Sequence, residues 1–154
     1  MTKTTEQKFT CKINYEFDIT LENLRDLFCT MGQGSDYWAT DVIVGNILFE
    51  EDEEGVTYVK SGQDYGWEGC CMWLNELTLD SPITVEDIEE DKHQFKVKDV
   101  LTAIENIISG KTNLNRHDCG EIFQAFATND FGLIDSSIAD SILQITTYNT
   151  LVYG

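Results

Sequence analysis

Cysteine and histidine side chains occur at two places where they could hold a metal ion or act as a nucleophile. Cys70 is followed directly by Cys71, and His117 lies two residues before Cys119. The spacing contains no Cys-x-x-Cys or His-x-x-x-His pair, so it matches no standard zinc site. Neighbours two residues apart also rarely form a Cys–His nucleophile pair. We therefore predict packed thiols, a surface histidine at position 117 and no bound metal.

The residues from Glu50 to Gly55 have part of the spacing of a calcium-binding loop. Acidic side chains alternate at positions 50, 52 and 54 and precede a glycine, as in the first half of an EF-hand loop. The last position of that loop holds a bidentate glutamate, whereas this chain has Ser61 there. The sequence also has no Gly-x-Ser-x-Gly and no Gly-rich loop leading into Lys-Ser/Thr. We predict that the protein is not an enzyme and needs no cofactor.

Acidic residues dominate the charge of the chain. Its 154 residues include 28 acids and 10 bases, which gives a formal net charge of −18. Between Glu50 and Asp91, fourteen acids face one base, Lys60. Two blocks hold the carboxylates that we single out as partner-binding residues: Glu50, Glu51, Asp52, Glu53 and Glu54, and Glu86, Asp87, Glu89, Glu90 and Asp91.

This charge excludes some partners and favours others. It repels phosphate backbones and anionic membrane surfaces, so we expect no direct binding to nucleic acid or to a membrane. Carboxylates displayed in rows can instead imitate a phosphate backbone and occupy the basic groove of a nuclease or repressor. The alternative interpretation is a solvated acidic surface that keeps the protein soluble.

Aromatic residues next to glycines form the second candidate site. Tyr37 and Trp38 follow Gly32–Gly34, and Tyr65 and Trp67 lie in a Gly-rich stretch that we interpret as a loop. Such side chains can stack on the ring of a ligand or anchor a protein interface, and Trp38 can instead complete the core. A nucleotide pocket would also need guanidinium groups for phosphate, which only Arg25 and Arg116 supply.

The apolar pattern predicts the elements that position these residues. Apolar residues alternate from Phe9 to Ile19, which predicts a long half-buried strand. Further strands are predicted over 42–49, 56–60, 83–85, 94–97 and 148–153, and both acidic blocks then fall at hairpin turns at one end of a sheet. Residues 71–79 fit either a strand or a buried helical turn.

Helices are predicted over 20–31, 98–109, 118–128 and 136–146, where apolar residues recur at three and four positions. Thr20 and Asp135 are the expected N-caps of the first and last. The chain is therefore predicted to be one compact α+β domain over residues 1–154, an antiparallel sheet with hairpins packed against about four helices. Residues 1–7 are a candidate disordered start.

The cellular compartment follows from the cysteines and the N-terminus. Five cysteines, two of them adjacent, indicate reduced thiols, and the polar start lacks the apolar stretch of a signal peptide. No apolar run is long enough to span a bilayer. We therefore expect a cytoplasmic location.

Two motifs are similar to those of a known family. The segment Leu24–Trp38 resembles one in small acidic proteins of phages and mobile elements, where an aliphatic helix precedes a Gly-Gly-like turn and a Tyr-Trp pair. Residues 138–144 and 151–154 also resemble the C-termini of that family, so about a fifth of the chain is covered. Gln33 departs from the pattern, since many members have glycine there. The family is uncharacterised, so the resemblance implies only a phage or mobile-element origin and transfers no catalytic residue.

These observations lead to one predicted function and two alternatives. A phage origin implies, by context, an accessory protein that binds and inhibits a nucleic-acid-processing defence enzyme of the host, of the anti-CRISPR or anti-restriction type. The partner would be a host protein with a basic nucleic-acid-binding groove. One alternative is a module that binds a nucleotide signal. The other is a regulatory or structural homo-oligomer, such as a homodimer, paired through residues 8–19 or 147–153.

Overall fold

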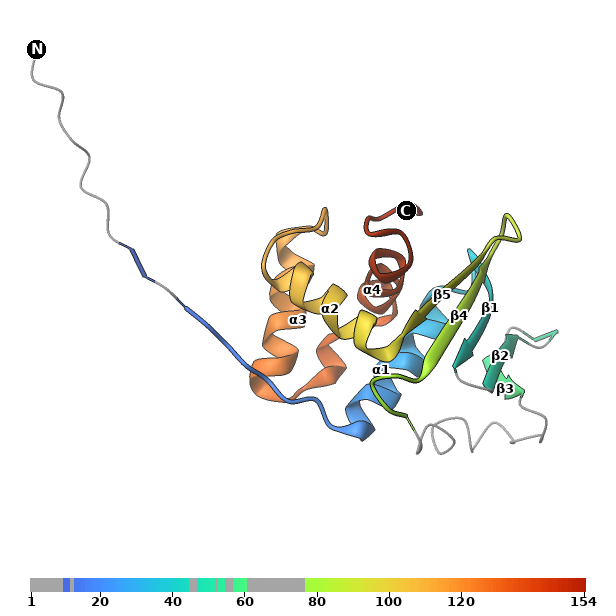
Figure 1. Cartoon of the computed structure of the whole chain (residues 1–154), viewed down its shortest axis with the longest axis horizontal. Coiled ribbons are helices and arrows are strands. Elements are labelled where there is room, and N and C mark those ends of the chain that lie inside the picture. Colours follow the sequence, from blue (N-terminus) through green and yellow to red (C-terminus); the bar gives the residue numbers. More distant parts are fainter. Residues whose placement is uncertain (1–9, 12, 45–46, 52, 55–56, 61–76) are drawn as a thin grey trace, which may run out of the picture.

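The computed structural model describes residues 10–11, 13–44, 47–51, 53–54, 57–60 and 77–154 (Figure 1). Within these ranges, five strands form one antiparallel sheet in the order β3-β2-β1-β4-β5. The strands are β1 (Ala39–Val44), β2 (Ile47–Glu51), β3 (Thr57–Lys60), β4 (Pro82–Asp87) and β5 (Lys92–Lys96). The described helices are α1 (Leu21–Gly34), α2 (Val97–Ile108), α3 (Arg116–Thr128) and α4 (Ser136–Tyr148), with a short 3-10 turn at Phe131–Leu133. The predicted α+β domain is thus confirmed.

The helices lie together on one side of the sheet (Figure 1). Helix α4 packs against α1, α2 and β5, so it is the central element of the helical layer. Strand β4 buries every second side chain, with Ile83 and Val85 almost fully enclosed. The core joins these to buried aliphatic side chains of all four helices, including Leu27, Ile107, Ile122 and Ile142. The alternation along β4 and the apolar stripes of the helices therefore meet in one core.

Local capping chemistry sets the helix boundaries. The side chains of Thr20, Asn115 and Asp135 each accept a hydrogen bond from the backbone N–H three residues further on. Both Asn129 and Asn149 end their helices in the left-handed conformation that asparagine tolerates. The predicted caps at Thr20 and Asp135 are confirmed, and the four predicted helices lie within a few residues of their expected bounds.

Helix α1 continues through Gly32 and ends at Gly34, three residues beyond the predicted end. A Cβ atom on Gly34 would lie 2.1 Å from the carbonyl oxygen of Ser136, the first residue of α4. Only hydrogen fits in that space. This glycine, at the end of α1, therefore permits the close approach of α1 to α4.

Three strand predictions were wrong. The described residues between 10 and 20 run extended but pair with no strand, because Phe17 packs on Phe123 and Phe126 of α3 and Ile19 packs on the core. The apolar run 42–49 divides into β1 and β2, whose register pairs Val44 with Ile47. The tail after Tyr148 forms no strand, because Tyr153 packs on aromatic side chains of the core. The expectations for residues 1–7, 61–69 and most of 71–79 lie outside the described residues.

Candidate interaction surface at the acidic end of the sheet

Both acidic blocks lie at the same end of the sheet. Strands β2 and β4 are each antiparallel to β1, so they run in the same direction. The turn after β2 and the turn after β4 must therefore leave the sheet at a common end. The first of these turns includes Glu53 and Glu54, and the second joins β4 to β5. The expectation that the two hairpins project together agrees with this topology.

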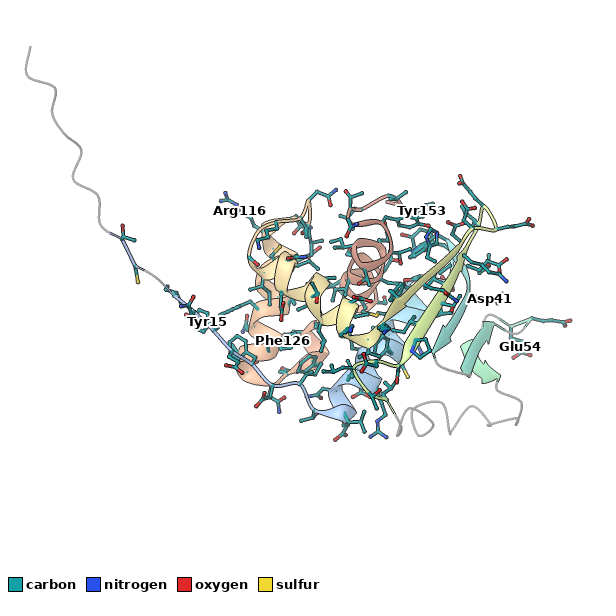
Figure 2. All side chains as sticks on the ribbon, in the orientation of Figure 1. Tyr15, Asp41, Glu54, Arg116, Phe126 and Tyr153 are labelled. Atoms are coloured by element: carbon teal, nitrogen blue, oxygen red, sulfur yellow. The ribbon has the colours of Figure 1, made fainter. Side chains whose placement is uncertain are left out.

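Asp41 lies between the two hairpins, where the sequence analysis had assigned no role. It stands on the central strand β1 and pairs in register with Glu86 of β4, while the next residue, Val42, pairs with Phe49 of β2. Figure 2 shows Asp41 and Glu54 at this end of the molecule. Asp41 thus lies at the same end of the sheet as the two acidic turns. Its place directly before the apolar run 42–49 was the available signal.

One carboxylate of the second block points inward. Asp87 is only 3% exposed, and its two oxygens accept hydrogen bonds from the backbone N–H groups of Glu89 and Asp91, Nε2 of His93 and the hydroxyl of Tyr148. The hydrogen bond from His93 is the main reason why the pKa of Asp87 falls to about 2, against the opposing effect of burial. Asp87 therefore shapes the turn and is not presented to a partner.

The remaining carboxylates of that turn face solvent. Glu89, Glu90 and Asp91 are all exposed, and Glu86 is half-buried. Glu90 has a φ of 65°, the left-handed conformation that a tight hairpin needs at one position. The turn therefore holds three charged side chains outward on a backbone that Asp87 braces from inside.

A second buried carboxylate holds the chain that leads into β1. Asp140 accepts hydrogen bonds from the Ser35 hydroxyl (2.8 Å), the Tyr37 hydroxyl (2.6 Å) and the indole N–H of Trp38 (2.6 Å). Gln144 donates to the same carboxylate from one turn further along α4. Burial and the hydrogen bond to Asp140 raise the pKa of Tyr37 to about 12. These side chains satisfy one another, which is the pattern of a structural polar network.

Exposed apolar side chains flank the acidic end. Tyr37 precedes β1 and is 50% exposed, Ile88 in the β4–β5 turn is 53% exposed, and Val152 in the C-terminal tail is 52% exposed. The tail is held in place because Oε1 of Gln144 accepts hydrogen bonds from the N–H groups of Val152 and Tyr153. The sequence signal for Ile88 is an apolar residue inside an acidic turn.

The residues of the predicted ligand site are not brought together. Trp38 is fully buried and stacks on Tyr153, with ring centroids 5.3 Å apart, so it is a core residue. Arg25 lies on α1, and Arg116 begins α3 on the side of the helices away from Tyr153 (Figure 2). Three further predicted residues lie outside the described part of the chain: Asp52, Tyr65 and Trp67.

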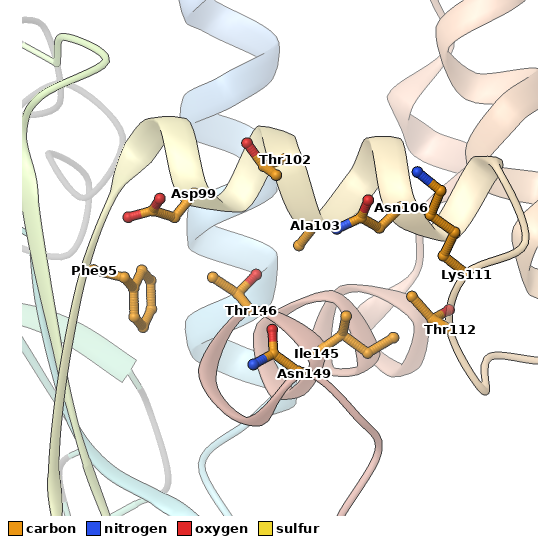
Figure 3. Close-up of a pocket in the computed structure, with 10 residues that line it drawn as sticks. All are labelled: Phe95, Asp99, Thr102, Ala103, Asn106, Lys111, Thr112, Ile145, Thr146 and Asn149. Carbon is orange, nitrogen blue, oxygen red and sulfur yellow. The ribbon is translucent and has the colours of Figure 1, made fainter.

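A hollow of about 380 Å³ lies between α2 and α4 and offers no better site (Figure 3). Thr102, Asn106 and Thr146 are among its lining residues, with Lys111 at one end. The one carboxylate, Asp99, already accepts a hydrogen bond from the backbone N–H of Lys96 at the helix start. The lining therefore has no convergent set of charged groups that would select a ligand.

His117 and Cys119 do not form a reactive pair. His117 contacts Asp118 and Glu121, whereas the thiol of Cys119 donates to the carbonyl of Leu114. Burial raises the pKa of the Cys119 thiol, which disfavours the thiolate. In the described ranges, no three His, Cys, Asp or Glu side chains are grouped to hold a metal ion. Cys70 and Cys71 lie outside those ranges.

Comparison with known proteins returns no relative. No family model, curated protein sequence or solved structure matches the chain. The resemblance to small acidic phage proteins therefore stays a prediction. Among the described helices, none has the length and apolarity to cross a membrane.

Proposed function

We propose that this protein is a non-enzymatic phage or mobile-element accessory factor that occupies the basic nucleic-acid groove of a host defence enzyme. The acidic end of the sheet is its binding surface. The observation that carries the proposal is the common direction of β2 and β4, which gathers two acidic turns and Asp41 at one end. Carboxylates on adjacent strands then present a row of negative charge to a basic groove.

The apolar residues beside this surface support a protein partner. Tyr37, Ile88 and Val152 are each about half exposed, and Ile88 lies within the acidic β4–β5 turn. Protein interfaces combine such apolar anchors with a charged rim, whereas a purely solubilising surface has no need of them. We therefore assign the anchors to these three residues in addition to the predicted Tyr65 and Trp67.

The rigid base of the β4–β5 turn also supports the proposal. Asp87 holds the turn through backbone groups and is itself held by His93 and Tyr148. A pre-formed surface loses little conformational entropy on binding. The alternative of a nucleotide-binding module loses one of its candidate stacking residues, because Trp38 is buried in the core.

A pull-down of tagged protein from nuclease-treated host lysate, at low and high salt, tests the proposal. We expect a nucleic-acid-processing enzyme in the low-salt eluate and its loss at high salt, since charge-steered binding is screened by salt. An eluate without such an enzyme at low salt contradicts the proposal.

Charge-reversed variants then locate the surface on that partner. Reversing Glu51, Asp52 and Glu53 to lysine, or Glu89, Glu90 and Asp91 to lysine, should weaken binding by at least about tenfold. The matched control reverses Glu22, Asp26 and Glu105, three exposed acids of α1 and α2, with the same change in net charge. Binding within about threefold of wild type in both acidic-end variants, or an equal loss in the control, excludes mimicry by this surface.

A further inference from the structure

The segment before α1 and two of the helices border a hollow that the acidic surface does not use. The hollow has a volume of about 600 Å³ and is lined by residues of the segment 13–19, α2 and α3. We call it the apolar hollow. Figure 1 shows the segment 13–19 on the side of the helices away from the sheet, so the apolar hollow is separate from the acidic end. Its volume is in the range of small-molecule pockets.

Aromatic rings make up much of the wall of the apolar hollow. The described residues that line it include Tyr15, Phe17, Phe123 and Phe126. Tyr15 stacks on Phe17 with ring centroids 5.7 Å apart, and both rings meet Phe123 nearly at right angles. The faces of these rings therefore point in more than one direction. The face of an aromatic ring carries partial negative charge and attracts a cation.

The apolar hollow is open to water at the segment 13–19. Ile13 is 61% exposed and Tyr15 is 62% exposed. Figure 2 shows Tyr15 on the segment outside the helices, with Phe126 among them. Leu101 and Ile108 of α2 add aliphatic lining. A ligand with an apolar body would cover these side chains and remove apolar surface from water, which favours binding.

The charged groups among the described lining residues are all acidic. They are Glu16, which lies between Tyr15 and Phe17 in the chain, and Glu105 of α2, and both are exposed. None of the described lining residues is a lysine, an arginine or a histidine. The net charge of −18 adds a field that attracts cations and repels anions.

The end of helix α2 adds negative potential at the same place. The helix ends at Ile108, which lines the apolar hollow together with Ser109. The carbonyl groups at a helix C-terminus and the helix dipole favour a cation. The last turn of α2, which the structure describes in full, contains no basic residue. Lys111, which follows in the chain, lines the separate hollow between α2 and α4.

We propose that the apolar hollow binds a small organic cation with an apolar body, that is, an aromatic or alkyl ammonium compound. This inference is independent of the proposed function, because the two sites share no residue. The body of the ligand contacts the aromatic rings and the aliphatic side chains of α2, and its ammonium group faces Glu105 in the last turn of that helix. A neutral ligand gains only the apolar contact, and an anionic ligand is repelled by the carboxylates. The charge of the ligand therefore decides its affinity.

Three probes with the same carbon skeleton test this proposal: phenylbutylammonium, phenylbutanol and phenylbutyrate. Titration of the intact protein, followed by NMR chemical shifts near neutral pH and at low salt, should give phenylbutylammonium a dissociation constant of about 1 mM or below. Phenylbutanol should bind at least about fivefold more weakly, and phenylbutyrate more weakly still. A smaller ratio between the ammonium compound and the alcohol, or no binding of the ammonium compound at about 10 mM, overturns the proposal.

Amide substitutions locate the ammonium group. Glu16→Gln with Glu105→Gln removes both carboxylates and keeps the shape of the side chains. It should weaken phenylbutylammonium by about fivefold or more and leave the affinity for phenylbutanol within about twofold. The matched control is Glu89→Gln with Glu90→Gln, which removes the same charge from the exposed β4–β5 turn. Equal losses in the two double variants would assign the attraction to net charge alone and overturn the site.

The aromatic wall has its own test. Tyr15→Leu keeps an apolar side chain at a position that is 62% exposed but removes the ring, and it should weaken phenylbutylammonium by about threefold. In the wild type, the ring resonances of Phe123 and Phe126 should shift as the ammonium compound binds. Shifts confined to residues that do not line the apolar hollow overturn the proposal.

Discussion

The indole N–H of Trp38 donates a 2.6 Å hydrogen bond to Oδ1 of Asp140, which joins the entrance of β1 to the middle of α4. The two residues are 102 positions apart in the chain. Trp38 is fully buried and Asp140 is 7% exposed, so neither group has water as an alternative partner. This contact positions the segment that carries Tyr37. The same segment leads into β1, the central strand at the acidic end.

Replacing Asp140 with alanine should therefore destabilise the protein strongly. The change leaves the Trp38 indole and the Ser35 hydroxyl without an acceptor in the core, which costs about 2–4 kcal/mol. The free energy of unfolding from guanidinium denaturation measures this. Asp36→Ala, at an exposed site, is the control that removes the same charge and should change stability by less than about 0.5 kcal/mol. Equal effects of the two variants would contradict the assignment of Asp140 as a structural anchor.

Two glycine-to-alanine changes should have opposite effects on the stability of the folded protein. At Gly34 the new Cβ would meet the carbonyl oxygen of Ser136 at 2.1 Å, so α1 and α4 must separate, at a cost of about 1–3 kcal/mol. At Gly120, within α3, no atom lies within 4 Å, and alanine should stabilise the helix by about 0.5–1 kcal/mol. Thermal melting of both variants decides the matter. A neutral Gly34→Ala would show that the helix contact is not tight.

Local signals were enough to predict the helices and the β4–β5 hairpin. Thr20 and Asp135 cap their helices through a hydrogen bond with a residue three positions away, so the sequence window contains the whole cause. The two acidic turns could be recognised from the sequence, whereas their common end depends on the strand order, which only the structure gives. Local chemistry and global topology agree at these elements.

The errors arose where distant contacts decide the structure. The alternation from Phe9 to Ile19 is that of a strand, but a pattern cannot show whether a neighbouring strand exists. In the run 42–49, the Gly45-Asn46 pair was a hairpin signal that apolar continuity outweighed. Asp87 was counted with the surface acids because its partners His93 and Tyr148 come from β5 and α4. The buried role of Asp87 could be seen only in three dimensions.

Replacing Glu90 with glycine should stabilise the β4–β5 turn. Its φ of 65° is strained for glutamate and unstrained for glycine, and the gain should be at most about 1 kcal/mol after the greater chain entropy of glycine is included. Glu89→Gly removes the same charge from a residue outside the positive-φ region and should destabilise slightly. Urea denaturation of the two variants compares them. The assigned turn geometry is wrong if the order of stability is reversed.

Low pH should lower the free energy of unfolding, partly because Asp87 becomes protonated. Its pKa of about 2 in the folded protein is below the ordinary value of 3.8, chiefly because His93 donates a hydrogen bond to it. A depressed pKa contributes stability that is complete above pH 4 and is lost as the pH falls toward 2. Unfolding free energies of wild type and Asp87→Asn should therefore differ most near neutral pH and converge near pH 2. A pH-independent difference would contradict this linkage, and exposed Asp91→Asn is the control that should show little convergence.

High pH should lower the free energy of unfolding because the pKa of Tyr37 is raised in the folded protein, whereas that of Asp87 is lowered. Burial and the hydrogen bond to Asp140 raise the pKa of Tyr37 to about 12 from an ordinary value of 10. The unfolded chain then loses this proton before the folded chain does, so the stability that Tyr37 contributes is complete below pH 10 and declines between pH 10 and 12. Burial and the hydrogen bond to Asp87 raise the pKa of Tyr148 further in the same direction. Phenolate absorbance measured against pH should lose one ionisation step near pH 12 in Tyr37→Phe. Loss of a step near pH 10 instead would show that the Tyr37 hydroxyl is not held by Asp140.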